Sequence, residues 1–170
     1  MEVKVEALLV SPVHAYEGRP ADGPRPDPVP VAREQVEVRA GLGLVGDRYF
    51  AHAAHRRAAV TVFAAESLDL LTAELGLPAT PDVLLTRRNI VLRGYPVDRL
   101  VGADFSLDTG DGPVRLRAHR PAAPCRWMDV VLASGAWKAL RGRGGVRCEP
   151  LDDGVLCRGP ARLRIEQVTP

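Results

Sequence analysis

The residue whose type and surroundings most clearly indicate chemistry is Cys125. It follows Pro124 at the end of a predicted strand and precedes a predicted helix, with Arg117, Arg120 and Arg126 close by in the sequence. Cations and a helix N-terminus both stabilise a thiolate, which is the form of cysteine that attacks electrophiles and binds metals. Cys125 is therefore predicted to be a reactive thiol or a ligand for a soft metal.

The other two cysteines, Cys148 and Cys157, lie in short alternating apolar segments typical of strands. Free cysteine is among the most often buried residue types, so packing is the expected role of both. The N-terminus lacks a positive region followed by an apolar run, and no stretch approaches the about 20 apolar residues of a membrane span. We therefore expect a cytoplasmic protein with free thiols and no membrane partner.

A cysteine hydrolase would need a histidine as general base. His119 lies six residues before Cys125, whereas His14, His52 and His55 are distant in sequence, and no local motif connects any of them to the thiol. His52 and His55 could present two imidazoles on one helical face, but zinc would need at least one further ligand. A polar loop is the preferred interpretation of that pair.

Arginine dominates the positive charge, because all but two of the 23 basic residues, Lys4 and Lys138, are arginine. Residues 113–147 hold eight basic residues and a single acidic one, Asp129. The planar guanidinium suits phosphate and other oxyanions, so this segment predicts either an anion site or a solvated basic face. No nucleic-acid motif or interleaved aromatic pattern accompanies the charge, so nucleic acid is not the expected partner.

Further polar positions precede a short apolar strand, where Arg87, Arg88 and Asn89 occur together. Asn89 could satisfy backbone groups, or Arg88 and Asn89 could bind a phosphate or the edge of a heterocycle, and composition leaves these alternatives equal. The glycine-rich segment 41–48 calls for tight turns but lacks the ending of a nucleotide-phosphate loop.

Short strands are the commonest elements that the sequence predicts around these residues. Two helices are predicted at 66–75 and roughly 128–140, a hairpin turn at 108–112, and a proline-rich loop insertion at about 18–31. Seven to nine strands with two or three helices favour an antiparallel or mixed barrel over a doubly wound sheet, in a single domain spanning residues 1–170. The strands are predicted at 3–10, 34–39, 59–63, 88–92, 105–107, 114–118, 146–149, 155–157 and 163–168.

Six motifs occur in a recognisable order between residues 36 and 166. They are GLGLVGDRYF at 41–50, RAAVTV at 57–62, RRNIVLRG at 87–94, LVGADF at 100–105, PC at 124–125 and LRGRGGVR at 140–147. This ordered set resembles the MOSC domain family, the module found at the C-terminus of molybdenum-cofactor sulfurases and as free-standing bacterial proteins. One departure is Gly159-Pro160, where the family often has Gly-Asp.

The resemblance implies a mainly β fold with a few helices, a MOSC-type β-barrel similar to the barrel domain of pyruvate kinase, with molybdenum cofactor bound at one mouth. The family's Pro-Cys cysteine is taken to carry sulfur or to ligate molybdenum, which assigns that role to Cys125. The cofactor-binding residues predicted from family motif positions are Arg48, Arg88 and Asn89; Arg120, Arg143 and Arg147 are added from charge alone.

Some relatives reduce N-hydroxylated small molecules, and this is the expected activity. The chain has neither a ferredoxin-type cysteine run nor a dinucleotide fingerprint, so such an oxidoreductase would need an external electron donor. Two alternatives remain. One is a non-catalytic sulfur carrier or cofactor-handling module, in which Cys125 receives a persulfide from a sulfur-donor protein. The other is a repurposed barrel enzyme that uses Cys125 as a nucleophile.

Overall fold

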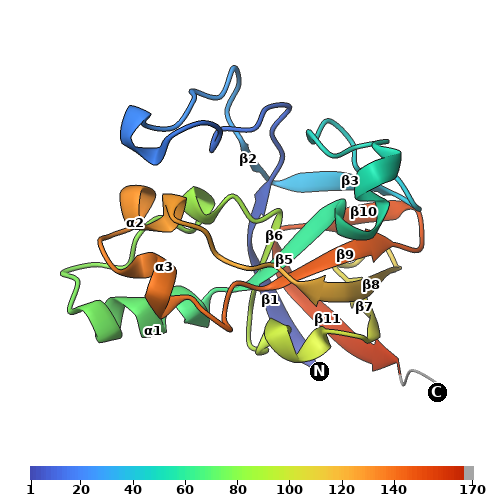
Figure 1. Ribbon diagram of the computed structural model, residues 1–170. Helices are drawn as coiled ribbons and strands as arrows, with labels where there is room; N and C mark the ends of the chain where they lie inside the picture. The colour runs from blue at the N-terminus through green and yellow to red at the C-terminus, as the bar shows by residue number, and fades with distance from the viewer. Residues whose placement is uncertain (167–170) are drawn as a thin grey trace.

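A closed β-barrel forms the centre of the computed structural model, which describes residues 1–166 (Figure 1). Within these residues seven strands close the barrel in the order β11, β7, β8, β9, β5, β6 and β1, and β1 pairs back to β11. Neighbouring strands are antiparallel except β5 and β6, which are parallel. The bounds are β1 Glu2–Leu9, β5 Val60–Ala64, β6 Ile90–Arg93, β7 Asp104–Asp108, β8 Pro113–Pro121, β9 Val146–Pro150 and β11 Gly159–Glu166.

A smaller sheet lies beside the barrel and consists of β10 (Gly154–Cys157), β3 (Gln35–Arg39) and β4 (Gly43–Leu44). The two-residue strand β2 (Ala32–Arg33) pairs with the end of β1. The barrel that the sequence predicts is thus confirmed, while β2 and β4 are too short for a periodic pattern to reveal.

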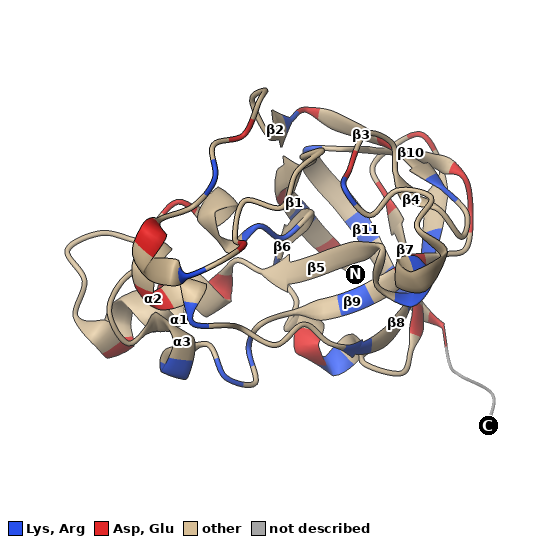
Figure 2. Ribbon diagram, turned by 45° about the horizontal axis from the view of Figure 1, so that its top comes forward, with Lys and Arg blue, Asp and Glu red and all other residues tan. Residues whose placement is uncertain are grey.

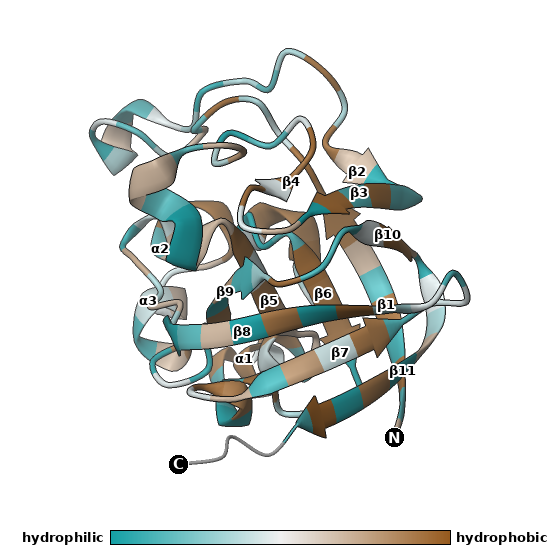
Figure 3. Cartoon of the chain, turned by 90° about the vertical axis from the view of Figure 1, so that its right-hand side faces the viewer, coloured by the Kyte–Doolittle hydropathy of each residue, from teal (hydrophilic) through white to brown (hydrophobic). Residues whose placement is uncertain are grey.

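Alternation along the strands explains where the core lies. In β8, Val114, Leu116 and Ala118 are buried, while Arg115 and Arg117 between them are exposed. Successive side chains of a strand point to opposite faces, so one face of β8 fills the barrel and the other meets solvent. All of β5 is buried, because its outer face is covered by helices, and its apolar segments are brown in Figure 3.

The first helix, α1 (Glu66–Leu75), agrees with the prediction and connects the parallel strands β5 and β6, as a parallel crossover requires. It ends at Gly76, whose φ of 61° is the left-handed conformation that suits glycine. Four 3-10 turns also occur in the described chain: η1 Pro20–Asp22, η2 Ala53–Ala58, η3 Val83–Thr86 and η4 Val97–Leu100. No helix in residues 1–166 has the length and apolar character needed to span a membrane.

The single helix expected at 128–140 is wrong, because two short helices occupy this region: α2 (Trp127–Val131) and α3 (Ala136–Ala139). Gly135 adopts a φ of 90° between them, which interrupts the helix. The Asp129 carboxylate accepts a hydrogen bond from the Trp137 backbone N–H at 2.7 Å and replaces the lost helical partner. Apolar residues of both helices still pack on β5 and α1. The buried positions were therefore predicted correctly, although one continuous helix was not.

The proline-rich insertion is exposed along most of its length, as expected, and is joined to the barrel by a partly buried ion pair. Arg87 donates hydrogen bonds to both carboxylate oxygens of Asp27, at 2.7 and 3.0 Å, and the Ser11 hydroxyl donates to the same carboxylate at 2.6 Å. Figure 1 shows the loop above α2. Asp27 therefore fixes the insertion next to the segment that precedes β6.

The departure from the family pattern at Gly159-Pro160 lies in the barrel wall. Pro160 is the second residue of β11 and stands opposite Lys4 on β1. Pairing between β11 and β7 begins only at Arg162, so Pro160 lies near the strand start, where proline is tolerated. The predicted end of this strand at Val168 lies outside the described residues.

Candidate functional site

Cys125 lies in a cleft of about 170 Å³, here called the Cys125 cleft, at the end of the barrel next to α2. The thiol residue is exposed, between β8 and α2, and its backbone carbonyl accepts a hydrogen bond from the Met128 N–H at 3.0 Å. Because α2 has only five residues, arginines rather than the helix supply most of the positive field here. The cleft is lined by His14, Tyr16, Arg48, Tyr49, Thr61, Thr86, Arg87, Arg88, Ala123, Pro124, Cys125, Met128 and Arg147.

Arg48 is the clearest sign that the cleft accepts an anion. Its side chain is only 11% exposed, and its buried Nε and Nη1 atoms have no hydrogen-bond acceptor. Nη1 lies 3.6 Å from Asp47 Oδ2, beyond hydrogen-bonding distance, and the guanidinium carbon lies 4.8 Å from the centre of the Tyr49 ring. Buried donors are rarely left without acceptors, so these atoms point to a ligand that supplies them.

Arg88 fixes the cleft wall and also contributes charge. Its Nε donates to the Gly144 carbonyl and its Nη2 to the Ala122 carbonyl, both at 2.9 Å. Burial, and then repulsion by Arg147, lower the pKa of the Arg88 guanidinium to about 10, so it stays charged at neutral pH. Its Nη1 donates to no acceptor within residues 1–166 and is free for a ligand.

Arg147, from β9, also lines the cleft and, unlike Arg87, which pairs with Asp27, forms no ion pair with any described residue. Arg48, Arg88 and Arg147 therefore face one cleft, and within residues 1–166 Asp47 is the only carboxylate at ion-pair distance from any of them. An excess of charge of one sign in a partly buried cleft raises the local concentration of ligands of the opposite sign. The cleft is suited to an oxyanion next to a thiol.

Asn89 does not line the cleft but is buried beneath it, 1% exposed. Its amide nitrogen donates to the Leu9 carbonyl and to Asp47 Oδ2, both at 3.1 Å, and its amide oxygen accepts from the Thr61 N–H and hydroxyl, both at 2.9 Å. Every hydrogen-bonding atom of this side chain is used within the protein. Asn89 thus orients Asp47, the neighbour of Arg48, which is the backbone-satisfying alternative left open by the sequence.

The other two predicted arginines also lie away from the cleft. Arg143 forms an ion pair with Glu74 at 2.8 Å. Arg120 stands opposite Arg147 across β8 and β9 but faces a neighbouring hollow that it shares with Arg57 and His119. Blue segments on β9 and beside α3 in Figure 2 mark the basic stretch to which these residues belong. Nearness in sequence did not predict these positions, because Arg120 follows an irregularity in the β8–β9 pairing and Arg143 lies before β9, where it pairs with Glu74.

The histidine nearest to Cys125 in the sequence does not line the cleft, whereas a distant one does. His119, the one nearest to Cys125 in the chain, forms a 2.9 Å contact with Glu149 outside the cleft. His14 lines the cleft, and burial, followed by the charge of Arg48, lowers its pKa. Within residues 1–166 no group of three or more His, Cys, Asp or Glu side chains could hold a metal ion, which leaves the pair His52 and His55 without a zinc site.

Sequence reasoning missed His14, Tyr16 and Tyr49 as cleft residues. Tyr16 stacks on Trp127 of α2 with ring centres 5.3 Å apart, and burial raises the pKa of its hydroxyl to about 12. His14 and Tyr16 lie more than 100 residues before Cys125, and no local pattern connects them. Of the three, only Tyr49 lies in a motif visible in the sequence, at 41–50, and could have been assigned to the site from that motif.

The remaining thiols do not reach the cleft. Cys148 is fully buried in the barrel core, where burial raises its pKa. The predicted packing role of Cys148 is confirmed. Cys157 is partly buried on β10, and its backbone N–H donates to the Thr109 hydroxyl at 3.0 Å.

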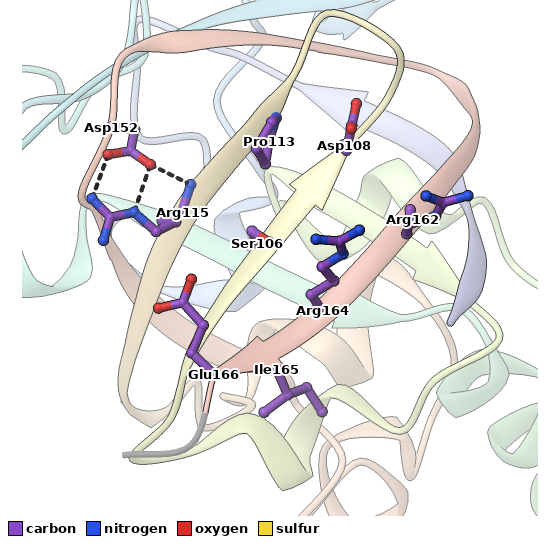
Figure 4. A pocket seen from close by; sticks show the side chains of 9 residues that line it. All are labelled: Ser106, Asp108, Pro113, Arg115, Asp152, Arg162, Arg164, Ile165 and Glu166. Carbon is purple, nitrogen blue, oxygen red and sulfur yellow. Dashed lines mark hydrogen bonds and ion pairs between the residues drawn. The ribbon is translucent and has the colours of Figure 1, made fainter. Parts of the chain in front are cut away.

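Another hollow lies on the outer surface of β7, β8 and β11 (Figure 4). Arg115 there is paired with Asp152 at 2.8 Å, and Arg164 shares the hollow with Glu166 and Asp108. Its lining contains both signs of charge and neither cysteine nor histidine. Unlike this hollow, the Cys125 cleft combines an excess of positive charge with a thiol.

Comparison with known sequence families gives a match to one of them, described as the MOSC domain, over residues 49–160. The chain belongs to the MOSC domain family. The matched segment of this MOSC domain includes Arg88, Cys125 and Arg147, whereas Arg48 lies one residue before its start. The sequence matches no curated protein.

Solved structures share the fold of this MOSC domain at low sequence identity. YuaD from Bacillus subtilis is 15% identical, with 99% of this chain and 98% of that chain covered and a TM-score of 0.73. YiiM from Escherichia coli is 14% identical, covering 98% of this chain and 72% of that one, with a TM-score of 0.63. YiiM from Geobacillus stearothermophilus is 16% identical, covering 97% and 75%, with a TM-score of 0.62. At these identities the likeness establishes the fold.

Proposed function

We propose that this MOSC domain binds molybdenum cofactor in the Cys125 cleft, with Cys125 as a ligand of molybdenum, and reduces N-hydroxylated small molecules. The observation that carries the proposal is the pair of buried, acceptor-free Arg48 nitrogens facing the same cleft as an exposed thiol. Thiolate is a soft ligand that suits transition metals, and guanidinium groups suit a pterin phosphate.

The residues that line the cleft are of the chemical types that would bind the cofactor. Arg48, Arg88 and Arg147 would bind its anionic groups, and the neighbouring Asp47 carboxylate is already occupied by hydrogen bonds from Asn89 and backbone N–H groups. A cleft of about 170 Å³ is smaller than the roughly 300–1,000 Å³ of pockets that enclose a whole ligand. It would therefore hold one end of the cofactor and leave the rest at the surface.

The bound cofactor supplies a two-electron redox centre, and the protein's residues bind and orient it. Cys125 would fix the metal end, and Arg88 would hold the wall beside it through its bonds to the Gly144 and Ala122 carbonyls. Electrons would come from a separate donor protein, and a reducing compartment such as the cytoplasm would keep Cys125 as a free thiol.

Metal analysis tests the proposal directly. Protein purified from a molybdenum-replete host should contain about one molybdenum per chain, and Cys125→Ala should abolish both the metal and the reduction of an N-hydroxylated amidine by a reduced viologen dye. Cys157→Ala is the matched control, because it removes a thiol outside the cleft and should retain both.

Two outcomes would contradict the proposal. One is a folded wild-type protein that carries no molybdenum when the host supplies the cofactor. The other is a cyanide-labile sulfur on Cys125 without metal, which would establish the sulfur-carrier alternative and a sulfur-donor partner instead.

A further inference from the structure

A second hollow of about 420 Å³ adjoins the Cys125 cleft, here called the Trp137 pocket. Its lining includes Asp98, Pro121, Ala122, Pro124, Trp137 and Arg141. The pocket and the cleft share two residues, Ala123 and Pro124, so a single stretch of chain next to Cys125 separates them. A molecule in the Trp137 pocket would therefore lie beside the thiol.

The wall between the two hollows is held in place by several hydrogen bonds. Arg88 donates to the Ala122 and Gly144 carbonyls, and the Ala122 N–H donates to the Gly145 carbonyl at 2.7 Å. Gly144 allows this approach, because a Cβ atom there would stand 2.2 Å from the Ala122 oxygen. The Trp137 pocket is thus a fixed feature of the fold, with one side built by a cleft residue.

The pocket combines apolar walls with one exposed arginine and one partly buried carboxylate. Proline, alanine and tryptophan make up most of its walls, and Arg141 lines it with its guanidinium carbon 5.1 Å from the Trp137 ring centre. Arg126 is outside the lining but lies at the same distance from that ring. Both arginines are exposed, and neither has a carboxylate partner among residues 1–166. An anion with an apolar body would match the apolar walls and the two arginines.

Asp98 is the acidic residue that lines the Trp137 pocket. It is partly buried, and one carboxylate oxygen accepts a hydrogen bond from the Gly145 N–H at 2.9 Å. Burial raises the pKa of Asp98 from its ordinary value. Because the Asp98 carboxylate is bonded to the Gly145 backbone whereas Arg141 has no carboxylate partner in residues 1–166, the ligand's charged end is expected at Arg141.

We infer that the Trp137 pocket binds an organic carboxylate with an apolar body, the body against Trp137 and Pro124 and the carboxylate at Arg141, with Arg126 adding positive charge beside the same ring. The volume suits a small organic molecule. Naming this carboxylate as the substrate class of the Cys125 cleft rests on the proposed function, whereas the binding itself does not. Substrates of this class would bind in the Trp137 pocket and react in the adjoining Cys125 cleft.

The probe for the experiment is 4-phenylbutyrate, with the neutral 4-phenylbutanol as its matched analogue. In a ¹H–¹⁵N titration of the full chain, the Trp137 indole signal, assigned by comparison with Trp137→Phe, should shift on adding the carboxylate. Arg141→Gln and Arg126→Gln should each weaken binding about tenfold, as should replacing the carboxylate by the alcohol. Arg164→Gln removes an exposed arginine from a different hollow and should leave the affinity unchanged.

Equal affinity for the alcohol, or no effect of Arg126→Gln and Arg141→Gln in folded protein, would overturn the inference, as would a Trp137 signal that does not respond. Cys125→Ala should bind 4-phenylbutyrate as the wild type does. Loss of molybdenum without loss of this binding would therefore separate failure of the proposed function from failure of the pocket assignment. Conversely, protein that contains molybdenum but does not bind 4-phenylbutyrate would show that the pocket assignment fails while the proposed function stands.

Discussion

Two neighbouring arginines of similar burial provide a direct test of whether the cleft is built for an anion. The Arg48 and Arg87 side chains are 11% and 9% exposed and line the same cleft. Arg87 is fully engaged with Asp27, whereas Arg48 has two buried nitrogens without acceptors. Replacing each by methionine keeps the length and apolar stem, so the two variants differ mainly in the interactions that the guanidinium makes.

The expected magnitudes follow from those contacts. Arg87→Met leaves Asp27 without its charged partner and should lower the free energy of unfolding by about 3 kcal/mol. Arg48→Met loses a contact with the Tyr49 ring and the 3.6 Å attraction to the buried Asp47 carboxylate, which keeps its hydrogen bonds from Ser11, Tyr49 and Asn89, together about 2–3 kcal/mol. It also removes two unsatisfied buried donors that cost about 1 kcal/mol each, so its net effect on ligand-free protein should lie within about 1 kcal/mol of zero.

Urea unfolding of protein from a host that does not make the cofactor measures both effects, without and with inorganic phosphate. Phosphate should stabilise the wild type and Arg87→Met, by about 2.7 kcal/mol at one hundred times its dissociation constant. Arg48→Met should lose this response. A destabilisation of Arg48→Met as large as that of Arg87→Met, or a full phosphate response in Arg48→Met, would refute the assignment of Arg48 to anion binding.

Two further predictions concern the other thiols and the insertion. Cys148→Ala should cost about 1–2 kcal/mol in urea unfolding because it empties core volume, Cys157→Ala should cost less, and molybdenum content that falls in either would contradict Cys125 as the working thiol. Burial raises the pKa of Asp27, but hydrogen bonds from Arg87 and Ser11 outweigh it and hold that pKa below its usual value. The stabilisation is therefore present above about pH 4 and is lost as the pH falls further. The stability difference between wild type and Asp27→Asn should shrink from pH 7 to pH 3, and a difference independent of pH would show that the pair is not responsible.

Local patterns predicted the elements that local physics controls. The α1 helix was found at its observed bounds because its apolar residues repeat at helical spacing and Gly76 can adopt the left-handed conformation that ends it. The helix expected at 128–140 failed because a side chain, Asp129, and a positive φ at Gly135 decide the break, and neither changes the apolar pattern. Strands β2 and β4 were missed because two residues carry no period.

The candidate site was predictable only in part, for the same reason. The type of Cys125 and its Pro-Cys context indicated the thiol, motif positions of the family resemblance indicated Arg48 and Arg88, and the abundance of arginine indicated Arg147; all four line the cleft. Arg120 and Arg143 were included because they are near in sequence, but Arg120 follows an irregularity in the β8–β9 pairing and lines the hollow shared with His119, and Arg143 pairs with Glu74. His14 was left out because nothing between it and Cys125 in the chain connects them.

The sequence by itself determined that this protein forms a barrel, that it carries one distinctive thiol, and that arginine dominates the chain around that thiol. Those properties reside in residue types and short spacings. Tertiary structure alone decided which arginines face the thiol, that Asn89 lies beneath the cleft, and that a second pocket adjoins it. Barrel closure causes this difference, because pairing β1 with β11 and β5 with β6 brings residues together whose separation in the chain hides their proximity.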